Sequence, residues 1–172
     1  MASPVTVDAP DKTGTPPPWE RKLNRRLPLF GHRNWIVVAD AAYPAQSNSG
    51  IETIVAGTDQ LSTAKTVLDR IAQEKHIRAK VYTDLELDFV EETDAPGIAE
   101  YRHHLRGLLA GATTKQLPHE QILAKLDQCG QVFKVLVIKT SLTLPYTSVF
   151  IELDCGYWSA EAENRLRAAM QT

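Results

Sequence analysis

The sequence predicts an α/β fold, a single three-layer domain whose largely parallel sheet carries helices on both faces. Three observations lead to this prediction. Short apolar, β-branched runs alternate with segments in which apolar residues recur every three or four positions. The length of 172 residues, of which 43% are apolar and 23% charged, suits one globular domain with a hydrophobic core. No internal repeat divides the chain further.

The expected strands are the apolar runs. WIVVA at 35–39 is continuously apolar, which is typical of a strand buried on both faces of the sheet. VFKVLVI at 132–138 and SVFIEL at 148–153 are similar runs and predict two more strands. IETIV at 51–55 and AKVYT at 79–83 are shorter candidates.

Helical periodicity separates these runs. Helices are expected at 61–72, at 98–108 before Gly111, at 122–126 before Gly130, and at 159–170. Thr58 or Asp59 could cap the first of these helices. Ser159 opens the last one, whose acidic first turn and basic later residues complement the helix dipole.

The two ends of the chain differ in composition from the middle. Five of the ten prolines lie within residues 1–18, so we expect a flexible Pro-rich tail there. The domain then spans 19–158, and residues 159–172 form a helical extension. The first segment of the domain, WERKLNRRL at 19–27, predicts a short basic helix that presents either a solvated face or an anion site.

Composition restricts the class of partner. The formal charge of −2 and the pI near 6.2 provide no sequence-wide field for polyanions, so we expect neither nucleic acid nor membrane as partner. No apolar run approaches the ~20 residues that cross a bilayer, and the amino terminus lacks the pattern of a signal peptide. Cys129 and Cys155 are too few for a disulfide framework, which favours reduced thiols. These features predict a cytoplasmic protein.

The common catalytic motifs are absent. The chain contains no GxGxxG, GxxxxGK[ST], GxSxG, HExxH or CxxC pattern, so neither a cofactor nor a metal is expected. Polar residues instead flank the best strand: His32 precedes WIVVA and Asp40 follows it. Asp40 either binds a ligand at the carboxyl end of its strand or caps a turn. His32 is either a proton donor or an ordinary loop histidine.

Two further polar residues stand at element boundaries. Tyr146 follows Pro145 before the run at 148–153, and His119 follows Pro118 in the first turn of an expected helix. Each has a simple structural explanation when taken alone: Tyr146 as part of the core and His119 as surface decoration.

Taken together, these positions resemble the D-ribose pyranase and L-fucose mutarotase family (RbsD/FucU) over about residues 29–153. The motifs that carry the resemblance are a Gly-His pair before an apolar strand that ends in Asp-Ala, the continuation DAAYPAQS from Asp40, the PHEQ helix start, and LPYTSVFIEL. The resemblance implies an RbsD-like fold and an isomerase that interconverts the anomers or ring forms of a sugar such as L-fucose or D-ribose without a cofactor.

The resemblance also implies roles for individual residues. His32 corresponds to the proton donor, and Asp40, His119, Tyr146 and Ser148 correspond to sugar ligands. The family usually has Asn where Ser148 stands, and an acid at the position of Asn34. These departures motivate an alternative, a non-catalytic sugar-binding or regulatory module on the same fold. A third interpretation is an interaction protein that uses the basic segment at 21–26 and the terminal helix.

The spacing of His32 and Asp40 has a geometric consequence. Eight extended steps of ~3.3 Å would separate them by roughly 26 Å, which exceeds the size of one monosaccharide. Either the loop at 30–34 folds back, or a neighbouring subunit completes the site. The resemblance implies ring-shaped homo-oligomers, a decamer among the candidate sizes, with sites at subunit contacts.

Overall fold

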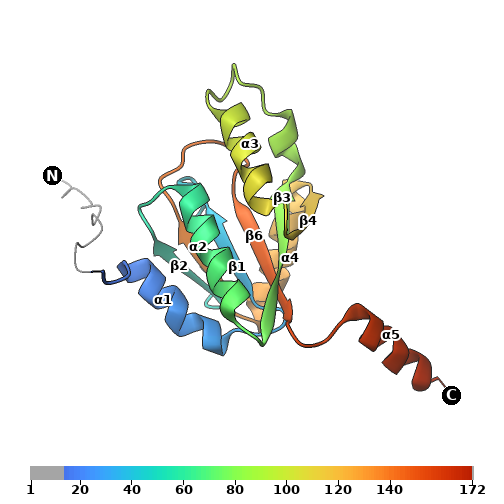
Figure 1. Ribbon diagram of the computed structural model, residues 1–172. Helices are drawn as coiled ribbons and strands as arrows, with labels where there is room; N and C mark the ends of the chain where they lie inside the picture. Colours follow the sequence, from blue (N-terminus) through green and yellow to red (C-terminus); the bar gives the residue numbers. More distant parts are fainter. Residues whose placement is uncertain (1–13, 172) are drawn as a thin grey trace.

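The computed structural model describes residues 14–171 and confirms the α/β prediction: a mostly parallel six-stranded sheet lies between helices (Figure 1). The α-helices are α1 Pro18–Arg26, α2 Gln60–Gln73, α3 Ile98–Leu109, α4 His119–Val132 and α5 Ala160–Ala169, with short 3-10 turns η1 Leu27–Leu29 and η2 Leu85–Phe89. The strands are β1 Trp35–Ala39, β2 Ile51–Val55, β3 Ile77–Asp84, β4 Thr113–Leu117, β5 Val135–Lys139 and β6 Val149–Cys155.

The order of the strands across the sheet is β2-β5-β1-β6-β3-β4. β1, β5 and β2 pair in parallel, as do β3 and β4, whereas β6 runs antiparallel to both β1 and β3. Since β6 opposes both of its neighbours, the other strands all point the same way. The carboxyl ends of β1, β3 and β4 therefore lie at the same edge of the sheet as the amino end of β6.

Side chains of β1 alternate between two cores, which explains its continuous apolar sequence. Ile36 and Val38 pack in the core under α1, α2 and α3, while Trp35, Val37 and Ala39 pack in the core under α4. All five side chains are buried. The prediction of a strand covered on both faces is confirmed, and so is the three-layer arrangement.

Several predicted boundaries hold. Asp59 caps α2 by accepting a hydrogen bond from the backbone N–H of Ser62 at 2.8 Å. Ser159 caps α5 by accepting from the N–H of Ala162 at 3.0 Å. Helix α1 begins at Pro18, one residue before the expected start. Most of the predicted Pro-rich tail, residues 1–13, lies outside the described residues.

Two sequence-based boundaries were wrong. The strand expected at 132–138 begins only at Val135, because α4 continues through Gly130 to Val132. Gly130 lets α4 pack closely against the start of β2, because a Cβ built on it would lie 2.9 Å from Ile51 Cγ1. Strand β4 was missed because its exposed residues, TTKQL, show no apolar alternation.

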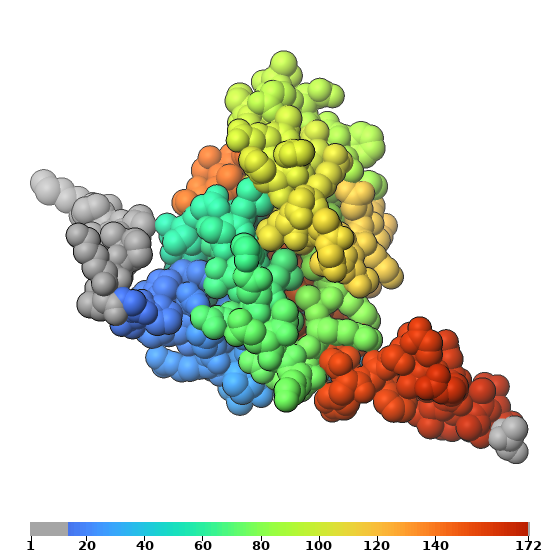
Figure 2. All heavy atoms as spheres, viewed as in Figure 1, coloured from blue at the N-terminus to red at the C-terminus, as the bar shows by residue number. Residues whose placement is uncertain are grey.

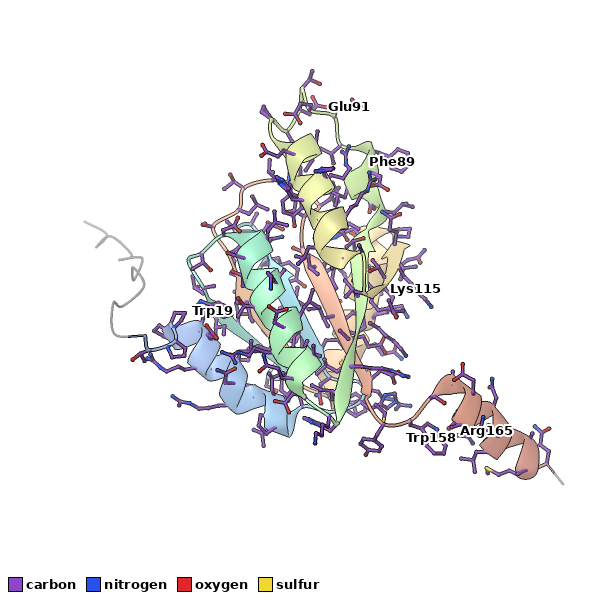
Figure 3. All side chains as sticks on the ribbon, viewed as in Figure 1. Trp19, Phe89, Glu91, Lys115, Trp158 and Arg165 are labelled. Atoms are coloured by element: carbon purple, nitrogen blue, oxygen red, sulfur yellow. The ribbon has the colours of Figure 1, made fainter. Side chains whose placement is uncertain are left out.

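Helix α5 extends away from the sheet, and none of its residues is buried (Figures 1 and 2). Exposed aromatic residues precede it: Tyr157 is 78% and Trp158 43% exposed. Figure 3 shows Trp158 next to the start of α5. No helix in the described part of the chain is long and apolar enough to cross a membrane.

Candidate functional site

Four of the five predicted site residues gather at one edge of the sheet. Asp40 follows β1, His119 follows β4, and Tyr146 and Ser148 precede β6. Because β6 is antiparallel to β1 and β3, these chain ends converge. Asp84, the last residue of β3, joins them. This is the edge at which open α/β sheets bind ligands.

An open pocket of about 420 Å³ lies at this edge. It is lined by Asp40, Ala42, Tyr43, Pro44, Gln46, His119, Leu123, Asp127, Pro145 and Tyr146. Its volume falls within the range of small-molecule sites, roughly 300–1,000 Å³. The lining offers carboxylate, imidazole, phenol and amide groups and includes no lysine or arginine from residues 14–171. Such a lining suits a ligand with several hydroxyl groups.

Ser148 holds Asp40 in place. Its hydroxyl donates to Asp40 Oδ2 at 3.0 Å, and the backbone N–H of Asp40 lies 3.2 Å from the same hydroxyl. Asp40 Oδ1 accepts from the N–H of Ala42 at 2.9 Å. Ser148 is only 2% exposed and does not line the pocket. Its predicted role as a direct sugar ligand is untested, and the position of its hydroxyl suits a supporting role.

His119 is fixed by two acidic residues. Its Nδ1 lies 3.0 Å from Asp84 Oδ1, and its backbone N–H donates to the Glu86 carboxylate at 3.0 Å. Asp84 is fully buried, and its Oδ2 has no hydrogen-bond partner among the described residues. Burial raises the pKa of Asp84 to about 6, although the hydrogen bond to His119 opposes that rise.

Tyr146 adopts a strained backbone conformation beside His119. Its φ of 56° lies in the left-handed region, which costs a non-glycine residue of order 1 kcal/mol. The rings of Tyr146 and His119 meet edge to face, with centroids 5.6 Å apart. The Tyr146 side chain is 40% exposed, so it remains accessible to a ligand in the pocket.

Negative charge surrounds the pocket. Burial, and then the charges of Asp127, Asp84 and Asp40, raise the pKa of the Tyr43 phenol to about 12. This phenol is therefore neutral at pH 7. The pocket consequently favours neutral ligands over anionic ones.

A buried polar cluster holds the loop before β6. Tyr101 from α3 donates to the Thr147 carbonyl at 2.6 Å, and the Gln60 amide from α2 donates to the same oxygen. Thr140 donates to Gln60 Oε1 at 2.8 Å. Gln60 and Thr147 are fully buried. The cluster connects two helices to the segment that carries Tyr146 and so fixes its position.

His32 lies at the opposite end of β1 from Asp40. The loop does not fold back, because the backbone N–H of Arg33 donates to the Leu153 carbonyl at 2.9 Å, near the end of β6. Arg33 itself has a left-handed φ of 77°. Asn34, which stands where the family usually has an acid, accepts from the N–H of Gly31 and stabilises this turn. Within one chain, His32 is therefore separate from the pocket.

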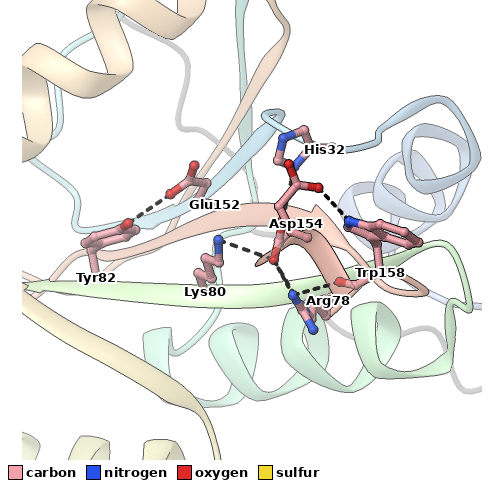
Figure 4. A network of polar contacts seen from close by, with 8 residues as sticks. His32, Arg78, Lys80, Tyr82, Glu152, Asp154 and Trp158 are labelled. Atoms are coloured by element: carbon pink, nitrogen blue, oxygen red, sulfur yellow. Dashed lines mark hydrogen bonds and ion pairs between the residues drawn. The ribbon is translucent and has the colours of Figure 1, made fainter. Parts of the chain in front are cut away.

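The His32 imidazole belongs to a second polar cluster (Figure 4). Its Nδ1 lies 3.1 Å from Asp154, which also pairs with Arg78 at 2.7 Å and Lys80 at 3.2 Å. Burial alone would raise the pKa of Asp154, but hydrogen bonds from Arg78 and Lys80 outweigh it and hold the pKa at about 2. The side chain of His32 is 56% exposed, so it can reach a neighbouring molecule.

Two basic side chains of helix α1 are paired with an acid, whereas Arg25 in its last turn is exposed. Lys22 and Arg26 both pair with Glu52, and Arg21 donates to the Pro16 carbonyl. The anion site considered from the sequence is thus partly neutralised. Among residues 14–171, no group of three or more His, Cys, Asp or Glu side chains is arranged to hold a metal ion.

Sequence reasoning missed Asp84 and Gln60. Asp84 ends its strand as Asp40 ends WIVVA, so the same criterion of a carboxylate directly after an apolar strand would have found it. Asp84 directly follows the expected strand at 79–83, so the sequence contained this signal. Gln60 carries no comparable signal, since its partners lie 41 to 87 residues away in the chain.

Fold and pocket together define an α/β protein with an open, polar pocket at the carboxyl edge of its sheet. Comparison with known proteins specifies the family. Residues 15–156 match the RbsD / FucU transport protein family, and the chain belongs to that family.

Two solved structures share this fold. Bacillus subtilis RbsD complexed with D-ribose is 22% identical, with a TM-score of 0.55, over 84% of this chain and 97% of that one. The fucose mutarotase from Streptococcus pneumoniae in complex with L-fucose is 19% identical, with a TM-score of 0.50, over 80% of this chain and 92% of that one. No curated protein sequence matches significantly.

Proposed function

We propose that the protein is a cofactor-independent monosaccharide mutarotase or pyranase, an isomerase that interconverts the anomers or ring forms of a free sugar. The convergence of Asp40, His119 and Tyr146 in one open pocket carries the proposal. Together these groups can accept and donate hydrogen bonds to several hydroxyls at once. Family membership and the sugar complexes of the two structural relatives support L-fucose or D-ribose as the class of substrate.

The charge of the pocket supports a neutral sugar rather than a sugar phosphate. Asp40 and Asp127 line the pocket, the buried Asp84 lies behind it, and the lining includes no lysine or arginine from residues 14–171. A phosphate would meet repulsion there without the arginine or lysine that phosphate sites normally supply.

The reaction requires one acid and one base. Ring opening moves a proton off the anomeric hydroxyl and places another on the ring oxygen. Each positioned proton transfer supplies roughly 10²–10⁴-fold acceleration, which is a modest requirement for a reaction that already proceeds in water. We assign the acid to His32, while Asp40, Tyr146 and His119 hold the hydroxyl groups.

This assignment requires a second copy of the chain. His32 and Asp40 flank β1 at opposite ends, roughly 26 Å apart if the segment is extended, so one sugar cannot contact both within one chain. We infer a homo-oligomer, such as a ring, in which the exposed His32 of one copy enters the pocket of another. A 19.1-kDa monomer in light scattering at micromolar concentration would contradict it.

The direct test compares the protein with its His32→Ala variant. Saturation-transfer NMR measures anomer exchange for L-fucose, D-ribose, galactose and allose. We expect the wild-type protein to accelerate exchange of at least one sugar and the variant to lose most of that acceleration. Unchanged exchange in a folded variant would remove His32 from the mechanism.

A non-catalytic sugar-binding module is the second candidate. Within one chain, His32 lies away from the pocket. A protein that stays monomeric would therefore have no proton donor in the pocket from this residue, which favours the binding module. Calorimetry distinguishes the two functions: sugar binding without accelerated exchange would select the binding module over the isomerase.

A further inference from the structure

The pair formed by Asp84 and His119 resembles the carboxylate–imidazole pairs that orient general bases. Asp84 Oδ1 lies 3.0 Å from His119 Nδ1, and the Asp84 side chain is fully buried. His119 lines the pocket, with 28% of its side chain exposed. Because Nδ1 is engaged by Asp84, the other ring nitrogen, Nε2, is the one available to a ligand.

We propose that Asp84 is a positioning residue that fixes His119 as its Nδ1–H tautomer and thereby makes Nε2 the proton acceptor for the anomeric hydroxyl. This inference rests on the proposed isomerase function and deepens it by assigning the base. An ionised carboxylate only accepts hydrogen bonds, so the atom that faces it must carry the proton. The unprotonated lone pair then lies on Nε2.

The surroundings of Asp84 leave His119 as its principal partner. The other ionisable groups that act on Asp84 are Glu86 from η2 and Asp40 from the loop after β1, and both are acidic. The phenols of Tyr43 and Tyr101 also lie within its electrostatic reach. Since Asp84 Oδ2 has no hydrogen-bond partner among the described residues, its bond to His119 is the main compensation for its burial.

Asp40 is less suited to this proton transfer. Both of its oxygens already accept hydrogen bonds, from Ala42 and from Ser148. Imidazoles as a class exchange protons near neutral pH, whereas carboxylates release theirs well below it. We therefore assign Asp40 to hydroxyl binding and His119 to proton acceptance.

The step balances without an added reagent. The anomeric O–H proton moves to His119 Nε2, the O–H electron pair forms the C1=O1 bond, and the bond between C1 and the ring oxygen breaks. The ring oxygen keeps that electron pair and takes a proton from His32 of the neighbouring copy. Ring closure on either face of the aldehyde reverses these transfers and restores both imidazoles.

The test uses the full-length protein and its Asp84→Asn variant. Asp88→Asn is the matched control, because Asp88 lies four residues further on and pairs with Arg106 and Gln116 instead of His119. The first readout is the imidazole ¹⁵N spectrum of histidine-labelled protein, with His119 assigned through the His119→Gln spectrum. We expect the Nδ1–H tautomer in the wild type and in the control, and a shift toward Nε2–H in Asp84→Asn.

The second readout is sugar exchange. Loss of one oriented base should lower kcat for ring opening roughly 10- to 100-fold in Asp84→Asn, with KM little changed, while Asp88→Asn keeps the wild-type rate. An Nε2–H tautomer in the wild type would overturn the inference even if the variant failed to fold. If Asp84→Asn exchanges sugar anomers as fast as Asp88→Asn does, the inference about Asp84 is also overturned, while the isomerase proposal stands. A wild-type protein that accelerates no sugar would refute both.

Discussion

Replacing Asp154 with asparagine is expected to lower the free energy of unfolding by about 2–3 kcal/mol at pH 7. Asp154 is 8% exposed and pairs with Arg78, Lys80 and His32. Its pKa falls from an ordinary 3.8 to about 2 in the folded protein. Each pKa unit corresponds to about 1.4 kcal/mol, which gives the expected loss.

The sign of the pH dependence follows from the lowered pKa. The folded pKa lies below the unfolded one, so this contribution is fully present above about pH 5 and is lost as the pH falls through about 2. The stability difference between wild type and Asp154→Asn should therefore be largest at neutral pH and shrink steadily in acid.

Urea unfolding of both proteins at pH 7 and near pH 3 measures this difference. Asp69→Asn is the control, because the Lys65–Asp69 pair is exposed on α2 and should contribute at most about 0.5 kcal/mol. If Asp154→Asn is no less stable at pH 7 than Asp69→Asn, or if its deficit is the same at both pH values, the electrostatic explanation of this cluster is wrong.

Three further outcomes are expected. Leu153→Ala, which empties a fully buried position in β6, should cost about 2–5 kcal/mol in urea unfolding, and a cost below 1 kcal/mol would contradict the packing described. Truncation after Trp158 removes α5, in which no residue is buried, so the midpoint of thermal unfolding should barely change. A large fall in the midpoint would show that α5 makes stabilising contacts with the rest of the domain. D-ribose 5-phosphate should exchange its anomers no faster with the protein than without it in saturation-transfer NMR. Acceleration equal to that of free D-ribose would refute the charge argument for the pocket.

Much of the fold could be predicted from local patterns. WIVVA indicated a central strand because both of its faces are covered, and Asp59 and Ser159 cap helices as their sequence positions suggest. β4 could not be predicted, since an exposed edge strand needs no apolar alternation. Gly130 misled the prediction because it allows close packing against Ile51 instead of ending α4.

The candidate site was only partly predictable. Asp40, His119 and Tyr146 were found individually, but their convergence depends on β6 running antiparallel between β1 and β3, which no local pattern encodes. Asp84 directly follows the expected strand at 79–83, so its place at this edge could have been predicted by the criterion that found Asp40. The spacing of His32 from Asp40 did raise the question of a second subunit, and the extended course of β1 removes the possibility that the loop folds back.

Mixing two inactive variants tests the shared site most directly. His32→Gln and His119→Gln are purified separately, unfolded together in equal amounts and refolded. If each site takes His32 from one copy and His119 from another, random association leaves about one site in four with both imidazoles, and exchange returns to about a quarter of the wild-type rate. A mixture that stays as inactive as its two components would contradict a site built from two copies.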